Sequence, residues 1–113
     1  MELTGVKDVR IGDMVFPVRE TTRSKIEFEN LAGITYYQFV SSFSTVSIEN
    51  QFKYFYCIAK AGAEKKGTEF KYTFEEFLSL TDDYYTEALT NFYKAIIPKP
   101  GGEGKKPKQK SSG

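Results

Sequence analysis

Threonine and serine residues stand directly before several stretches in which apolar side chains recur every three or four residues. In two of them, Thr35 with Gln38 and Thr73 with Glu76, the spacing is that of a capping box, where each side chain accepts a hydrogen bond from the other residue's backbone N–H. Such caps satisfy N–H groups that a helix leaves unpaired at its N-terminus, so they fix where a helix begins. The chain is therefore predicted to form a series of short helices.

The ends of these helices follow from the caps and from the glycines and the proline beyond them. The predicted starts are Thr21 or Thr22, Thr35, Ser47, Thr73, and Thr81 or Asp82, and the predicted ends include Gly33, Gly62 and Pro98. Residues 62–72 are polar and contain two glycines, which predicts a loop with room for a short extended piece at residues 69–72. No internal repeat is evident, and this excludes a solenoid.

The N-terminal stretch has the two-residue alternation of a strand instead. Two short apolar runs in residues 9–18 flank Gly12 and Asp13, a pair suited to a tight hairpin turn. Pro17 lacks an N–H group for a sheet ladder, so its strand is expected at an edge. The predicted fold is mainly α, with a short N-terminal β-hairpin (9–18) followed by a compact bundle of about five helices.

The composition changes at Pro98 and divides the chain in two. Residues 98–113 contain no apolar side chain except proline, so ordering them would bring no burial to offset the lost chain entropy. They carry five Lys and one Glu, whereas residues 1–97 carry 11 basic and 14 acidic side chains. We predict a single helical domain at residues 1–97 and a disordered, flexible basic tail at residues 98–113.

Several classes of function lack the residues that they need. Histidine is absent and Cys57 is the single cysteine, which excludes histidine triads, cysteine-cluster metal sites and an internal disulfide, and suits a reducing compartment. Gly62 and Gly67 have the spacing of a phosphate-binding loop, but the lysine of that motif is missing. The acidic pairs at residues 75–76 and 82–83 fit first helical turns better than a metal or acid–base site. We predict a protein that is not an enzyme, has no cofactor or metal, and, because its apolar runs are short, no membrane span.

Aromatic residues are unusually frequent, with ten Phe and eight Tyr making up 16% of the chain. The phenylalanines assigned to the core lie on the helical stripes: Phe39, Phe43, Phe52, Phe55, Phe74, Phe77 and Phe92. Tyrosine carries a hydroxyl that needs water or a polar partner, so tyrosines beside the stripes form either a partner-binding patch or the polar rim of the core. The candidate partner-binding residues are Tyr36, Tyr37, Tyr54, Ile58, Tyr84 and Tyr93.

The order of these pieces resembles that of a known family. A strand pair, VRIGDMVFPVR, leads into a helix and the segment IEFENLAGITYYQFVSSF, and then come an aromatic helix, a polar loop, the box TFEEFLSL and a final helix. Over residues 9–97 the chain is similar to the tail assembly chaperones of long-tailed bacteriophages and prophages. The residues that match are Arg23, Ile26, Glu27, Leu31, Gly33, Ile34, Thr73, Phe74, Glu75 and Glu76.

This resemblance implies a viral, non-enzymatic protein of the bacterial host cytoplasm. Such chaperones bind the tape-measure protein, keep its long apolar helices soluble and help to recruit tail-tube subunits. An apolar helical domain with tyrosines at its margin is compatible with binding a helix in a groove. The tyrosines and the basic tail depart from the commoner Leu-rich pattern, which leaves open the partner that is bound, and a homo-oligomer is left open too.

An alternative interpretation comes from the tail. Its lysines Lys105, Lys106, Lys108 and Lys110 suit a small nucleic-acid-associated or adaptor protein, in which tyrosines would stack on bases. The lysines are confined to the tail, however, while the tyrosines lie in an acidic domain. This segregation favours a solubilising or weakly associating tail, so nucleic acid is the less favoured partner.

Overall fold

A computed structural model of the chain describes residues 5–97. Two strands and five α-helices follow one another as β1 (Lys7–Ile11), β2 (Met14–Val18), α1 (Thr22–Ala32), α2 (Tyr36–Ser41), α3 (Ile48–Lys66), α4 (Phe74–Thr81) and α5 (Tyr85–Ile96). The predicted mainly α fold with an N-terminal hairpin is therefore confirmed. The flexible tail predicted at residues 98–113, and Pro98 as a helix end, lie outside the described residues.

The hairpin turns where the sequence predicts it and docks on α5. β1 and β2 pair antiparallel, with Val9 opposite Phe16, and bury one face of the ribbon. Gly12 adopts a φ of 59° in the turn, and its N–H donates a hydrogen bond to the carboxylate of Glu87 at 3.1 Å. A Cβ atom at Gly12 would lie 2.8 Å from the ring of Tyr84. The glycine thus serves both the turn and its close approach to the start of α5.

Four of the five predicted helix starts are confirmed by side-chain caps. Capping boxes at Thr21, Thr35 and Thr73 open α1, α2 and α4, and Ser47 caps α3. The fifth start is wrong, because Thr81 is the last residue of α4 and is 2% exposed. Its hydroxyl donates to the carbonyl of Phe77 at 3.1 Å, within α4. Asp82, the alternative start, lies at the end of α4 and not at the start of α5. Helix α5 begins after Tyr84 with no side-chain cap.

The end predicted for α3 is also wrong. The helix passes through Gly62 and continues to Lys66, where Gly67 provides the left-handed end with a φ of 74°. Gly62 is instead the place where the backbone of β2 meets α3, since a Cβ atom there would lie 2.1 Å from the carbonyl oxygen of Pro17. Residues 68–73 form a loop between α3 and α4, as predicted, and none of them belongs to a strand.

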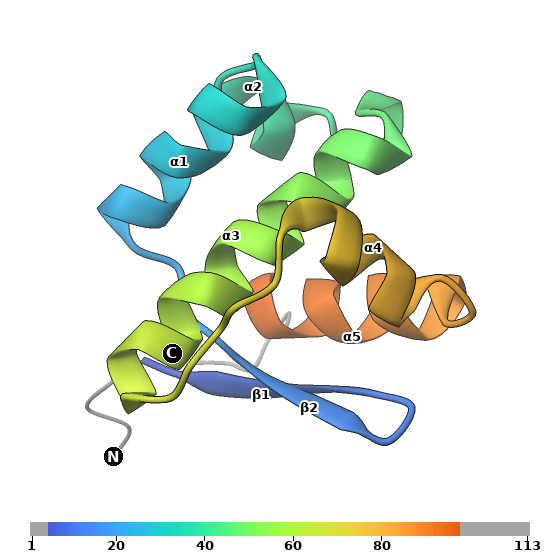
Figure 1. The fold of residues 1–113 in the computed structure, drawn as a ribbon. Helices are drawn as coiled ribbons and strands as arrows, with labels where there is room; N and C mark the ends of the chain where they lie inside the picture. Colours follow the sequence, from blue (N-terminus) through green and yellow to red (C-terminus); the bar gives the residue numbers. More distant parts are fainter. Residues whose placement is uncertain (1–4, 98–113) are drawn as a thin grey trace, which may run out of the picture.

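Helix α3 runs through the middle of the fold, as Figure 1 shows. Helices α1 and α2 lie along one side of it, while α4, α5 and the hairpin lie on the others (Figure 1). Helix α2 is shorter than its apolar stripe predicts, because Phe43 falls in a 3₁₀ turn, η1 (Phe43–Thr45). The fully buried large side chains are mostly aromatic: Tyr54, Phe28, Phe39, Phe55, Phe77 and Phe92. The core is thus built around α3, with aromatic rings on both of its flanks.

Candidate partner-binding groove

Two of the predicted partner-binding residues belong to the core. Tyr54 and Ile58 are both 0% exposed, so neither contributes to an accessible patch, and this part of the prediction is wrong. Tyr54 packs edge-on against Phe28 and lies 4.6 Å from the ring of Phe39, centroid to centroid. Burial raises the pKa of the phenol well above its ordinary value, and so does the carboxylate of Glu20, which accepts a hydrogen bond from the hydroxyl. The apolar stripe of α3 was wider than its spacing indicated.

The other predicted tyrosines lie in separate places. Tyr37 is 76% exposed on α2, and the partly exposed Tyr84 packs at the hairpin turn. Tyr36 is half-buried next to Tyr54, and Tyr93 is half-buried with its hydroxyl donating to Gln51 at 2.6 Å. They do not form one continuous patch. The candidate tail residues Lys105, Lys106, Lys108 and Lys110 lie outside the described residues.

A different surface is shaped by the segment that joins β2 to α1. The N–H of Arg19 donates a hydrogen bond to the carbonyl of Ile58 in α3 at 3.0 Å, and the carboxylate of the next residue, Glu20, accepts a hydrogen bond from the hydroxyl of Tyr54. Thr21 then starts α1 through its reciprocal bonds with Ser24, each 2.9 Å long. The start of α1 is therefore held against the second half of α3 by consecutive residues, and the two helices leave a groove on one side of their contact.

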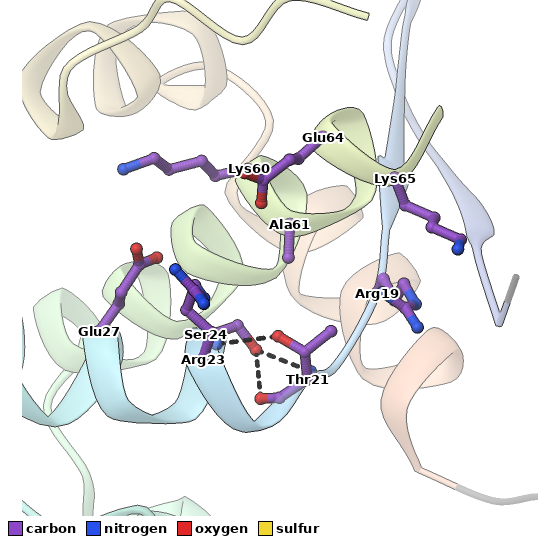
Figure 2. Close-up of a pocket in the computed structure, with 9 residues that line it drawn as sticks. All are labelled: Arg19, Thr21, Arg23, Ser24, Glu27, Lys60, Ala61, Glu64 and Lys65. Carbon is purple, nitrogen blue, oxygen red and sulfur yellow. Dashed lines mark hydrogen bonds between the residues drawn. The ribbon is translucent and has the colours of Figure 1, made fainter. Parts of the chain in front are cut away.

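One end of this α1–α3 groove is basic. It is a hollow of about 600 Å³, and Figure 2 shows side chains from α1 and the segment before it facing those of α3. Its lining residues are Arg19, Thr21, Arg23, Ser24, Glu27, Lys60, Ala61, Glu64 and Lys65. Glu64 and Lys60 lie one helical turn apart on α3, and Arg23 and Glu27 have the same spacing on α1. The two helices thus face each other with parallel rows of charged side chains.

The other end of the groove is more apolar. A second hollow of about 420 Å³ shares Glu27 and Lys60 with the first and continues to Leu31 and Tyr56. Leu31 is 40% exposed although it is a large apolar residue, and Tyr56 is half-buried. The α1–α3 groove, defined by these two hollows, therefore changes from charged to apolar along its length.

The cations of the basic end are not neutralised within the described chain. Among residues 5–97, the ion pairs are Lys53 with Glu49 and Lys71 with Glu69, and none involves a residue of the groove. Four basic and two acidic side chains line the basic end, a formal charge of +2. Residues 5–97 as a whole carry 11 basic and 13 acidic side chains, so the basic end is a positive area on an acidic domain. Such an area attracts anionic groups.

The floor of the groove does not offer a nucleophile. Burial raises the pKa of the Cys57 thiol to about 12, with Glu27 raising it further and Lys60 opposing the shift. The reactive thiolate is therefore scarce at neutral pH. Among the described residues no cluster of three or more acidic, cysteine or histidine side chains could hold a metal ion. The groove offers charge and apolar area to a ligand.

The spacing of charged and buried residues along α1 and α3 is a local signal for this groove. On α1, the buried side chains Ser24 and Phe28 are spaced by four, and the charged residues Arg23 and Glu27 repeat that spacing one position earlier. A charged row directly beside a buried row lies at the margin of a helix contact, where a groove wall forms. The same holds for Lys60 and Glu64 beside the buried residues of α3.

Comparison of the chain with protein-family models, curated protein sequences and solved structures gave no match. Within residues 5–97, none of the helices has the length and apolar character that crossing a bilayer requires.

Proposed function

We propose that this protein is a non-enzymatic tail assembly chaperone of a long-tailed bacteriophage or prophage. In this role it binds the tape-measure protein in the bacterial host cytoplasm and helps to recruit tail-tube subunits. The resemblance of residues 9–97 to that family is the starting point. The structure adds a surface on which such a partner would bind, the α1–α3 groove.

The observation that carries the proposal is the position of the family-like residues on α1. Arg23, Glu27 and Leu31, three of the residues that carry the resemblance, line the groove. The core contact of the same helix uses other positions, Ser24 and Phe28. Folding alone therefore does not require the charged and apolar residues at 23, 27 and 31, whereas binding a partner in the groove would use all three.

The chemistry of the groove fits a chaperone that covers a helix. A tape-measure protein presents long amphipathic helices whose apolar faces need protection before assembly, as the family resemblance implies. Grooves between two helices receive a third helix through apolar anchors at helical spacing, and charges at the rim fix its register. The α1–α3 groove supplies an apolar end and a charged end for these two tasks.

Co-expression tests the proposal directly. The full chain would be produced with a tape-measure protein encoded close to it, and the tape-measure protein assayed for solubility and for co-purification. We expect this chain to raise the soluble fraction of the tape-measure protein and to be recovered with it. A tape-measure protein that stays insoluble and recovers none of the chain would contradict the chaperone function.

The charge of the tail supports a second candidate, a small nucleic-acid-associated or adaptor protein. Residues 98–113 carry five Lys and one Glu. Binding to nucleic acid through these lysines would weaken steeply as salt is raised and would be lost when residues 99–113 are removed, because released counterions drive such binding. Binding that is absent, or that ignores salt, would exclude this candidate.

A further inference from the structure

We propose that the occupant of the α1–α3 groove is an acidic amphipathic helix, about two turns of which enter the groove. Its carboxylates lie among four cations of the groove, Arg19, Arg23, Lys60 and Lys65. A large apolar side chain of the same helix lies against Leu31 and Tyr56. This inference rests on the proposed function for the identity of the partner protein. The chemistry of the bound segment follows from the groove alone.

The length of the groove sets the length of the segment. Its wall on α1 runs from Arg23 to Leu31, eight residues along the helix, or about 12 Å at about 1.5 Å per residue. A helix lying alongside covers this distance with about two turns. Each wall carries one cation and one carboxylate a turn apart, Arg23 with Glu27 on α1 and Lys60 with Glu64 on α3. Carboxylates on the bound helix therefore pair with Arg23 and Lys60 at positions that avoid the two glutamates.

The charge of the groove sets the sign of the segment. Arg19, Arg23, Lys60 and Lys65 line the basic end, and none of the four forms an ion pair within residues 5–97. The backbone of Arg19 is anchored to α3, which places this residue at the groove, and its side chain has no carboxylate partner within residues 5–97. Carboxylates that arrive on a partner would pair with cations gathered at one end of the groove, which favours both encounter and register.

Two features of the groove favour a protein over a nucleic acid. Glu27 and Glu64 stand among the cations, and a continuous row of phosphates would be repelled where it passes them. A helix places its carboxylates at discrete positions and can avoid both residues. The apolar end at Leu31 also matches an aliphatic side chain, whereas it offers a nucleic-acid backbone no partner.

Designed peptides test the chemistry with the full-length protein. The first probe is a fluorescein-labelled peptide of about 18 residues with leucines on one helical face and glutamates beside them. The second is the same peptide with lysine in place of glutamate, and the third is a labelled oligothymidylate. We expect the glutamate peptide to bind at least about tenfold more tightly than the lysine peptide, as judged by fluorescence anisotropy. Equal binding of the two peptides, no binding of either, or tighter binding of the oligothymidylate would overturn the inference.

Variants of the groove locate the binding. Arg23→Glu combined with Lys60→Glu should weaken binding of the glutamate peptide by about tenfold or more, and Leu31→Gln should weaken it to a smaller extent. The matched controls are Arg10→Glu with Lys94→Glu, which changes the net charge equally at exposed positions outside the groove, and Ile48→Gln, which removes another exposed apolar residue. Controls that lose binding as strongly as the groove variants would place the peptide elsewhere and overturn the inference.

The same variants separate this inference from the proposed function. If the tape-measure protein is solubilised by the wild type and by the groove variants alike, the chaperone function stands and the groove is not its binding site. If the tape-measure protein is not bound but the glutamate peptide binds in the groove, the inference stands and the chaperone function is wrong. Circular dichroism of every variant would establish that each one is folded.

Discussion

The two sides of the second half of α3 are packed in opposite ways. On one side, Gly62 lets the backbone of β2 approach so closely that a methyl group has no space. On the other side, Lys60 and Glu64, two residues to either side of that glycine, line an open groove against α1. The same helical segment thus has a closed face built from small and apolar residues and an open face built from charged ones.

The difference between these faces shows where the chain can tolerate change. The closed face contributes to stability through contacts that leave no room, so substitutions there should reduce the free energy of unfolding. The open face contributes little to folding, so its residues are free to serve binding. The following substitutions test this division, in order of decreasing expected effect.

The largest effect is expected from Tyr54→Ala in the buried contact of α3 with α1 and α2. The substitution removes a fully buried ring that contacts Phe28 and Phe39, and it also removes the hydroxyl that donates to Glu20. Truncating a buried aromatic residue to alanine costs about 3–5 kcal/mol. Urea unfolding should show a loss of this size. A loss below about 1 kcal/mol would mean that Tyr54 lies at an accessible surface, one of the two alternatives that the sequence left open.

The next effect is expected from Gly62→Ala on the closed face. The added methyl group would meet the Pro17 carbonyl, and the hairpin must move away, at a cost of about 3 kcal/mol. The control is Gly67→Ala, where no atom lies within 4 Å of the new methyl group and only the left-handed backbone conformation is strained, at about 1 kcal/mol. Thermal unfolding of both variants would measure the contrast. Equal losses would show that β2 does not press on α3.

The sequence predicted where the helices start better than it predicted where they end and which of their sides are buried. A cap such as that at Thr73 depends on residues three apart, so local spacing reveals it. Gly62 looks like a helix end in the sequence, but its role depends on β2, which lies more than 40 residues earlier in the chain. Thr81 similarly resembles a cap, but in the structure it is the buried last residue of α4, where its hydroxyl donates to the carbonyl of Phe77.

The candidate site was harder to predict for the same reason. Tyrosine suggests a surface residue because of its hydroxyl, but the hydroxyl of Tyr54 meets Glu20, whose position depends on how β2 leads into α1. The groove is a property of two helices, and Arg23 and Lys60 are 37 positions apart in the sequence. The periodicity of a helix can indicate which row of its side chains lies beside a buried contact. The tertiary fold decides which rows of two different helices come to face each other.

Cys57 lies at the floor of the groove, and the pH dependence of stability tests how completely its thiol is buried there. Its thiol, 2% exposed, has a pKa raised by burial from 9.0 to about 12. Below pH 9 the thiol is protonated in both states, so its contribution to stability is complete. Above pH 9 the unfolded chain releases the proton first, and the free energy of unfolding should fall by about 1.4 kcal/mol per pH unit until the folded thiol also titrates near pH 12.

Denaturation of the wild type and of Cys57→Ala between pH 8 and pH 12 would isolate this contribution from those of lysine and tyrosine. The wild type should lose stability more steeply than the variant. Parallel pH profiles, together with rapid labelling of the thiol by a disulfide reagent at neutral pH, would mean that water reaches Cys57 through the apolar end of the groove. The floor of the groove would then be open to water at position 57.

The smallest effect on stability is expected on the open face. Lys60→Ala and Lys65→Ala should each change the free energy of unfolding by no more than about 0.5 kcal/mol, because both side chains are exposed and neither forms an ion pair within residues 5–97. Chemical denaturation of the two variants beside Gly62→Ala would measure the contrast along a single turn and a half of α3. A loss above about 1 kcal/mol at either lysine would show that the charged residues of the open face contribute to folding. Their charges could then no longer be assigned to binding alone. Changes close to zero would show that these two lysines of the positive area are not needed for folding. This is the result expected if their role is to bind a partner.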